Sequence, residues 1–303
     1  MGMHRAVLLA VFAALPAASA FLAPAHSVLG FARRSASNVQ AGSRQASRGI
    51  RLGLRMDAQD TRTFDGDMTD AGRRELKDLE GQWKKICVLG GSKGVGREIV
   101  KLLAARDVEV IALVRREESK TELESIKGVK CVLGNAMEAA DVIGVLDGCD
   151  ACVSTLGGES DGVRVDYKGN MNAIENAGIL GVTRMILVTS IGSGDSKDAI
   201  PAAVYDTLKS ALVDKTKAEN LLIKYYTNTD YTIVRPGGLI SAPSTGKAIL
   251  TEDKMASGAI HRSDVAKLVV DALYSKKLTK KIVTAIDPSL ANAPATAYKP
   301  ADV

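Results

Sequence analysis

Short runs rich in valine and isoleucine alternate along most of this chain with longer segments of helical period, and this alternation limits the possible folds more than any other feature. The runs are almost entirely apolar, which is typical of strands buried on both faces of a parallel sheet. We predict strands at residues 86–90, 108–115, 129–135, 151–157, 184–190, 231–237 and 281–286. The most prominent helices are predicted at residues 97–106, 167–181, 208–226 and 262–276.

This order of elements predicts an α/β fold with a doubly wound parallel sheet, that is, a Rossmann fold. Residues 86–287 would form a single domain with small loops on the substrate side. Apolar residues make up 46% of the chain, which is enough for a hydrophobic core of that size. We predict a linker with an appended helix over residues 56–85, and an extended tail rich in Pro and Ala over residues 288–303.

The first part of the chain has a composition of its own, with seven arginines and no lysine, Asp or Glu in residues 1–55. An apolar stretch at residues 6–20 follows Arg5, ends in small residues and is too short to span a bilayer, as in a secretory signal. The Ser-, Ala- and Arg-rich sequence behind it is typical of a transit peptide. The junction ASAFLAP, residues 18–24, resembles the Phe-centred signal of algae with plastids of secondary red origin.

We therefore predict that residues 1–55 are a bipartite targeting segment, and that the protein is located in such a plastid, in the stroma or at the thylakoid surface. A secreted protein with a basic propeptide is the alternative. No membrane-spanning run follows this segment, so we expect any membrane association to be peripheral.

The formal net charge of +5 arises in the targeting segment, because the rest of the chain is slightly negative. A nucleic-acid partner is therefore not expected. His261 is the only histidine after residue 55, which excludes a His-rich zinc site, and we predict no metal. Cys149 and Cys152 form a C-x-x-C pair, but a predicted strand rather than a helix follows Cys149, so a packing role is favoured over a redox role.

The stretch VLGGSKGVGREIV, residues 88–100, places glycines where the first predicted strand meets a helix. We expect Gly90 to permit a tight turn, Gly94 to let a pyrophosphate approach the backbone, and Gly96 to let the helix pack against the strand. Backbone amides and the positive end of the helix converge there, which favours an anion. The sequence therefore predicts a dinucleotide site rather than a bare structural turn, with Ser92 and Val95 among its residues.

The residues after the second predicted strand indicate which dinucleotide binds. NAD-selective sites usually carry an acidic residue there, whereas a 2′-phosphate requires a cation. Here Arg115 and Arg116 follow the strand, and Lys93 adds a cation from the glycine turn. Because guanidinium groups bind phosphate in a bidentate manner, we predict NADP(H) as the cofactor.

These residues resemble the short-chain dehydrogenase/reductase superfamily. GGSKGVG is similar to the turn of its Tyr-dependent members, and the rest of residues 86–287 is similar to its atypical, NmrA-like branch. The motifs that carry this second similarity are GCDACVSTLGG, VDYKGNMNAIENA, ILVTSIGS, KAENLLIK, DYTIVRPGGL and HRSDVAKLVVDAL.

The resemblance also implies individual contacts. Ser190, with Thr189 beside it, takes the position of the catalytic Ser or Thr, and Lys217 in KAEN matches the catalytic lysine that holds the nicotinamide ribose. The remaining implied cofactor contacts are Asn135 and Ala136 at the adenine, Thr155, Leu156 and Gly157 at the nicotinamide ribose, and Pro236, Gly237 and Gly238 at the carboxamide.

The chain departs from the Tyr-dependent members at the proton donor. Val213 lies four residues before Lys217, Ala211 lies four residues before Lys215, and neither can donate a proton. One prediction is an NADPH-dependent reductase whose planar, conjugated acceptor, such as a flavin, quinone or tetrapyrrole, needs no tyrosine. The alternative is a non-catalytic NADP(H)-binding scaffold or redox-sensing subunit of a plastid membrane complex. Loops at residues 192–208 and 239–260 are expected to select the substrate.

Overall fold

A single sheet of eight strands organises the part of the chain that the computed structural model describes, residues 83–160, 162–226, 229–291 and 297–303. The predicted targeting segment and nearly all of the predicted linker lie outside the described residues. The strand order is β10-β12-β8-β7-β4-β1-β2-β3. The strands are β1 (Lys85–Leu89), β2 (Glu109–Val114), β3 (Val129–Leu133), β4 (Ala151–Ser154), β7 (Arg184–Val188), β8 (Asp230–Pro236), β10 (Ile249–Thr251) and β12 (Lys281–Ile286).

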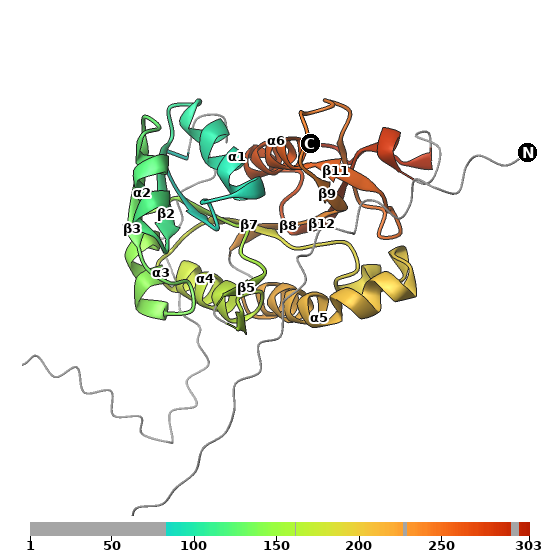
Figure 1. The fold of residues 1–303 in the computed structure, drawn as a ribbon, viewed down its shortest axis with the longest axis horizontal. Helices are drawn as coiled ribbons and strands as arrows, with labels where there is room; N and C mark the ends of the chain where they lie inside the picture. The colour runs from blue at the N-terminus through green and yellow to red at the C-terminus, as the bar shows by residue number, and fades with distance from the viewer. Residues whose placement is uncertain (1–82, 161, 227–228, 292–296) are drawn as a thin grey trace, which may run out of the picture. The chain divides into compact units, whose positions relative to one another are not determined.

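Helices cover both faces of this sheet (Figure 1). Helices α1 and α6 lie on one face, and α3, α4 and α5 lie on the other, while α2 packs beside β3. The α-helices are α1 (Gly94–Ala104), α2 (Glu117–Glu124), α3 (Ala139–Leu146), α4 (Lys168–Ile179), α5 (Ala202–Tyr225) and α6 (Arg262–Tyr274), and the 3₁₀ helices are η1 (Gly194–Ala199) and η2 (Pro288–Leu290).

All seven predicted strands are present and parallel to one another, which confirms the doubly wound sheet. The antiparallel edge strand β10 was not predicted, because it has only three residues inside an expected loop. Two further pairs are equally short: β5 (Glu159–Ser160) with β6 (Val163–Arg164), and β9 (Gly238–Ile240) with β11 (Ala259–His261).

The sheet separates two hydrophobic cores. Successive side chains of β1 point to opposite faces, so that Ile86 and Val88 pack in the core under α1 and α6, while Cys87 and Leu89 pack in the core under α3, α4 and α5. All four are fully buried. This two-sided burial explains why the central strands β1 and β4 are almost entirely apolar.

The chain order reverses between β1 and β4, which lie side by side in the sheet although β2 and β3 come between them in sequence. In doubly wound sheets the crevice at such a switch point, outside the carboxyl ends of the strands, is where ligands bind. The fold therefore places the glycine turn after β1 at the expected ligand position.

Described residues of the tail contact the domain. The Ala301 amide donates to the Leu250 carbonyl of β10 at 2.7 Å, and the Tyr298 hydroxyl donates to the Ser257 carbonyl at 3.3 Å. Among the described residues, no helix has the length and apolar character needed to cross a membrane.

Candidate dinucleotide site

A cavity of about 780 Å³ lies at the carboxyl ends of the parallel strands. Its lining comes from the glycine turn after β1, from the ends of β2, β3, β4, β7 and β8, and from α5 and the start of α6. A volume of this size falls within the range of small-molecule and cofactor sites.

The glycine turn has the geometry that a dinucleotide requires. Gly90 and Gly94 have φ of +82° and +58°, which favour glycine. A Cβ on Gly96 would lie 2.3 Å from the Gly90 carbonyl oxygen, so only glycine lets α1 pack this closely. Thr155 fixes the turn, since its amide and hydroxyl both donate to the Leu89 carbonyl, at 2.9 and 3.0 Å. These features fit a pyrophosphate lying against the N-terminal end of α1.

Most of the predicted site residues meet in this one cavity, although they come from six different strand ends. Ser190 is also in its lining. The predicted cofactor contacts that line it are Gly90, Ser92, Lys93, Gly94, Val95, Gly96, Arg115, Asn135, Ala136, Thr155, Leu156, Gly157, Thr189 and Pro236.

Four predicted cofactor contacts are not in the lining: Arg116, Lys217, Gly237 and Gly238. Arg116 is the exposed N-cap residue of α2 and has an extended backbone conformation. Gly237 and Gly238 instead hold the chain around Gly258: the Gly238 amide donates to the Gly258 carbonyl at 2.9 Å, and a Cβ on Gly237 would lie 2.3 Å from the same oxygen.

The structure also corrects the position of the lysine. Lys217 does not line the cavity: its side chain is 54% exposed, pairs with Asp214 at 2.8 Å and lies over the ring of Tyr167. Lys215 lines the cavity instead, together with Ala211 one helical turn earlier. The reason is helical geometry, because residues four apart share a face of α5, whereas a shift of two positions turns a side chain to nearly the opposite side.

Lys215 belongs to a charged cluster in the wall of the cavity. Its ammonium lies 3.0 Å from Asp166 Oδ1, and Arg164 Nη2 donates to Asp166 Oδ2 at 2.6 Å. The Gly158 amide donates to the same Oδ2 at 3.1 Å. Asp166 is fully buried, so two cations and an amide compensate the desolvation of its carboxylate. The cluster holds Lys215 against Gly157, where the predicted nicotinamide ribose would lie.

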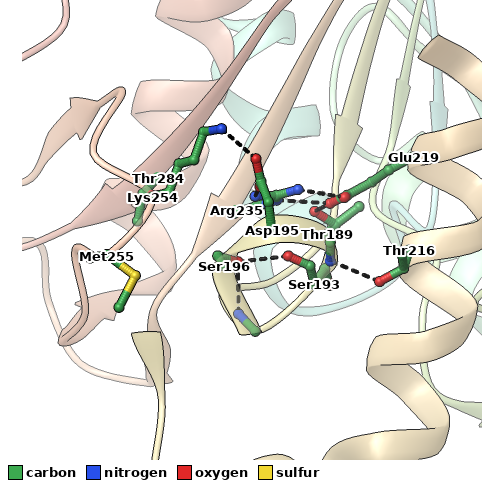
Figure 2. Close-up of polar contacts among 12 residues, drawn as sticks. Thr189, Ser193, Asp195, Ser196, Thr216, Glu219, Arg235, Lys254, Met255 and Thr284 are labelled. Atoms are coloured by element: carbon green, nitrogen blue, oxygen red, sulfur yellow. Dashed lines mark hydrogen bonds and ion pairs between the residues drawn. The ribbon is translucent and has the colours of Figure 1, made fainter. Parts of the chain in front are cut away.

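A buried ion pair supports the floor of the cavity at Thr189 (Figure 2). The Thr189 hydroxyl donates to Glu219 Oε1 at 2.7 Å, and Arg235 donates to both Glu219 oxygens, from Nε at 3.0 Å and from Nη2 at 2.7 Å. Arg235 also pairs with Asp195 at 2.6 Å, which in turn pairs with Lys254. This network joins α5, β8, η1 and the loop that carries Lys254.

Electrostatics in the network favour the charged carboxylate. Burial opposes ionisation of Asp195, but the hydrogen bonds from Arg235 and Lys254 hold its pKa below the usual range. The Thr189 hydroxyl donates a hydrogen bond to Glu219, and the Ser190 hydroxyl donates one to the Ile191 carbonyl at 2.9 Å. Both hydroxyl hydrogens are therefore used in hydrogen bonds within the protein. In this arrangement both hydroxyl oxygens keep lone pairs that can accept a hydrogen bond.

The charged residues of the cavity lining that sequence reasoning did not assign to the site are Glu159, Arg164, Asp166, Lys215 and Arg262. For Lys215 no deciding signal was present in the sequence, because Ala211 and Lys215 have the same i, i+4 spacing as Val213 and Lys217. The others come from the β5–β6 hairpin and the start of α6, and no local pattern indicates that these segments approach the glycine turn.

The cysteines and acidic residues do not form a second site in the described part of the chain. No group of three or more His, Cys, Asp or Glu residues there could hold a metal ion. Burial raises the pKa of Cys149 to about 12, and contact with Cys152 together with burial raises the pKa of Cys87. These thiols therefore stay protonated and serve as core residues.

The fold and the glycine turn define a dinucleotide-binding protein of the doubly wound class. A family model described as NAD(P)H-binding matches residues 90–276, more than half of the chain. The chain therefore belongs to this NAD(P)H-binding family, within the NmrA-like part of the short-chain dehydrogenase/reductase superfamily.

Known relatives carry several names. The chain is 35% identical to the "uncharacterized sugar epimerase YhfK" of Bacillus subtilis, over 63% of this chain and 89% of that protein. It is 32% identical to the chloroplastic protein At2g34460 of Arabidopsis thaliana, over 71% and 80%. Among solved structures it resembles ChuY of Escherichia coli O157:H7, described as an anaerobillin reductase, with a TM-score of 0.63, 31% identity and coverage of 69% and 100%.

The pea protein TIC 62, also chloroplastic, is 28% identical over 61% of this chain, but the match spans only 39% of TIC 62. The chloroplastic relatives support a plastid location for this protein.

Proposed function

We propose that this protein binds NADP(H) in the cavity and reduces a planar, conjugated acceptor without the help of a tyrosine acid. The observation that carries the proposal is the lining itself. A glycine cradle for a dinucleotide continues directly into a substrate side where Ala211, rather than a proton donor, lies one turn before Lys215.

The choice of NADP(H) rests on Lys93 and Arg115. Both line the cavity beside the glycine turn and the end of β2, where the adenosine ribose of a dinucleotide would lie. A 2′-phosphate there would have two cations within the same wall of the cavity.

When bound, NADPH would supply a hydride to the acceptor. A conjugated acceptor spreads the resulting negative charge over its ring system and takes its proton from water. Lys215 would hold the ribose and place a positive charge near the reacting atoms, while Thr189 and Ser190 offer lone pairs because their protons are engaged elsewhere. The reductase named among the similar structures, ChuY, supports this class of reaction.

Turnover of NADPH with flavins, quinones and linear tetrapyrroles tests the proposal, with binding followed separately by nucleotide fluorescence. The variant Ala211→Trp is expected to reduce acceptor turnover at least tenfold, because the ring would fill the substrate side, with little change in NADPH affinity. Val213→Trp is the matched control, since Val213 is 37% exposed and does not line the cavity. Failure of the wild-type protein to bind NADPH would overturn the proposal.

A non-catalytic NADP(H)-binding subunit of a plastid membrane complex is the second candidate, and the partial similarity to TIC 62 favours it. It predicts tight NADPH binding, no turnover with any acceptor, and recovery with plastid membranes that depends on the nucleotide. A conjugated acceptor consumed at an appreciable rate would decide against it.

Localisation in a plastid of secondary red origin, in the stroma or at the thylakoid surface, is part of the proposal. Residues 1–55 fused to a fluorescent protein should direct it to such a plastid, whereas a secreted protein would deliver the fusion outside the cell.

A further inference from the structure

We propose that Arg262 is a ligand of the dinucleotide pyrophosphate and connects the bound nucleotide to the substrate-side loop. This inference rests on the proposed binding of NADP(H). Arg262 is the first residue of α6, and its half-buried side chain lines the cavity.

The guanidinium of Arg262 faces the turn at which a pyrophosphate would lie. A Cβ on Gly94 would meet only Arg262, with Nε at 3.8 Å and Cδ at 3.9 Å. Helices α1 and α6 pack side by side (Figure 1), and because Gly94 is the first residue of α1 and Arg262 the first of α6, this contact brings the two N-terminal ends together. Two helix N-termini and a guanidinium group together create a positive electrostatic potential that favours binding of an anion at this position.

The hydrogen bonds of Arg262 leave its phosphate-binding edge open. Nη1 donates to Ser241 Oγ at 2.6 Å and to the Leu239 carbonyl at 3.4 Å. Within the described residues both hydrogen bonds leave from Nη1, so the side-on pair of Nε and Nη2 remains for a bidentate contact with phosphate oxygens. One side chain can thus hold the phosphate and the substrate-side loop at Leu239 and Ser241 together.

The contact predicts a loss of affinity that does not depend on the 2′-phosphate. Arg262→Ala should weaken NADPH and NADH alike, by roughly 10- to 100-fold, the loss expected for a charge-assisted bidentate contact. Arg115→Ala should weaken NADPH only. Arg262→Lys keeps the positive charge but cannot donate two parallel hydrogen bonds to a phosphate, and it should recover part of the lost affinity. Ser241→Ala removes the shorter of the two hydrogen bonds between Arg262 and the loop, and should weaken both nucleotides by a smaller factor.

Fluorescence titration of the four variants with both nucleotides tests the inference, and adenosine 2′-monophosphate, which has no pyrophosphate, serves as a competing probe. Its affinity should be unchanged by Arg262→Ala. If wild-type protein binds NADPH and Arg262→Ala binds it equally well, or if the variant loses the 2′-monophosphate to the same degree, the inference is overturned. Wild-type protein that binds neither dinucleotide would overturn the proposed function instead.

Discussion

Lys93 and Arg115 give the cavity its predicted preference for a phosphorylated adenosine ribose. Replacing them together, as Lys93→Ala with Arg115→Asp, removes one positive charge and inverts another. We expect NADPH affinity to fall by about 100-fold or more, since each charge-assisted contact contributes roughly 1.5–3 kcal/mol. NADH affinity should change less than about threefold. Titration of the variant with both nucleotides measures the ratio, and equal losses would contradict the assignment of NADP(H).

Lys215 and Lys217 offer a second comparison between neighbouring residues of the same type. The Lys215 side chain is 14% exposed and lies against Gly157, whereas that of Lys217 is 54% exposed and outside the cavity. We expect Lys215→Met to weaken NADPH binding by about tenfold, and Lys217→Met to change it less than twofold. A titration in which Lys217→Met shows the larger effect would indicate that Lys217, and not Lys215, contacts the nucleotide.

Helix α5 shows how far a motif alone can mislead. The KAEN motif resembles the corresponding segment of related reductases, and this resemblance favoured Lys217. A motif of four residues, however, does not determine which side of the helix faces the cavity. The packing of α5 against α4 and the buried position of Glu219 orient the helix, and that orientation brings Ala211 and Lys215 inward. The strands, by contrast, were predictable one by one, because burial on both faces leaves a local apolar signal.

The pair formed by Glu219 and Arg235 joins α5 to β8, and both side chains are at most 3% exposed. Glu219→Ala would leave the Arg235 charge buried without its main partner, which is expected to destabilise the protein by about 3–5 kcal/mol. Glu219→Leu combined with Arg235→Met removes both charges and should recover much of that loss. Urea unfolding measures both variants. Equal destabilisation of the single and double variants would show that packing, rather than the unpaired charge, is responsible.

The whole domain should lose stability in acid through carboxylates that hold its loops. Burial opposes the charge of Asp264, but hydrogen bonds from Ser244, Thr245 and Gly246 hold its pKa below the usual range, and Asp287, bonded by Ser289 and Thr245, behaves likewise. A lowered native pKa contributes stability above the unfolded value of about 3.9, and this contribution is lost as the pH falls through the native pKa.

Asp264→Asn tests this pH dependence. The variant should be less stable than wild type by about 1–3 kcal/mol at pH 7, and the difference should shrink as the pH falls below about 4. Urea unfolding between pH 7 and pH 3 measures it. Asp302→Asn, in the exposed tail, is the control and should change stability by less than about 0.5 kcal/mol. A difference that stays constant down to pH 3 would contradict the role of the Asp264 charge.

The amino-acid sequence by itself determined the seven parallel strands, the doubly wound order and the glycine turn, because each depends on burial patterns or backbone freedom within a few neighbouring residues. Only the tertiary structure decided that Lys215 rather than Lys217 enters the cavity, that Gly237 and Gly238 hold Gly258, and that Arg262 lies over Gly94. These features depend on how helices rotate and which distant segments meet, and such choices are made by packing over the whole domain rather than by any local stretch of chain.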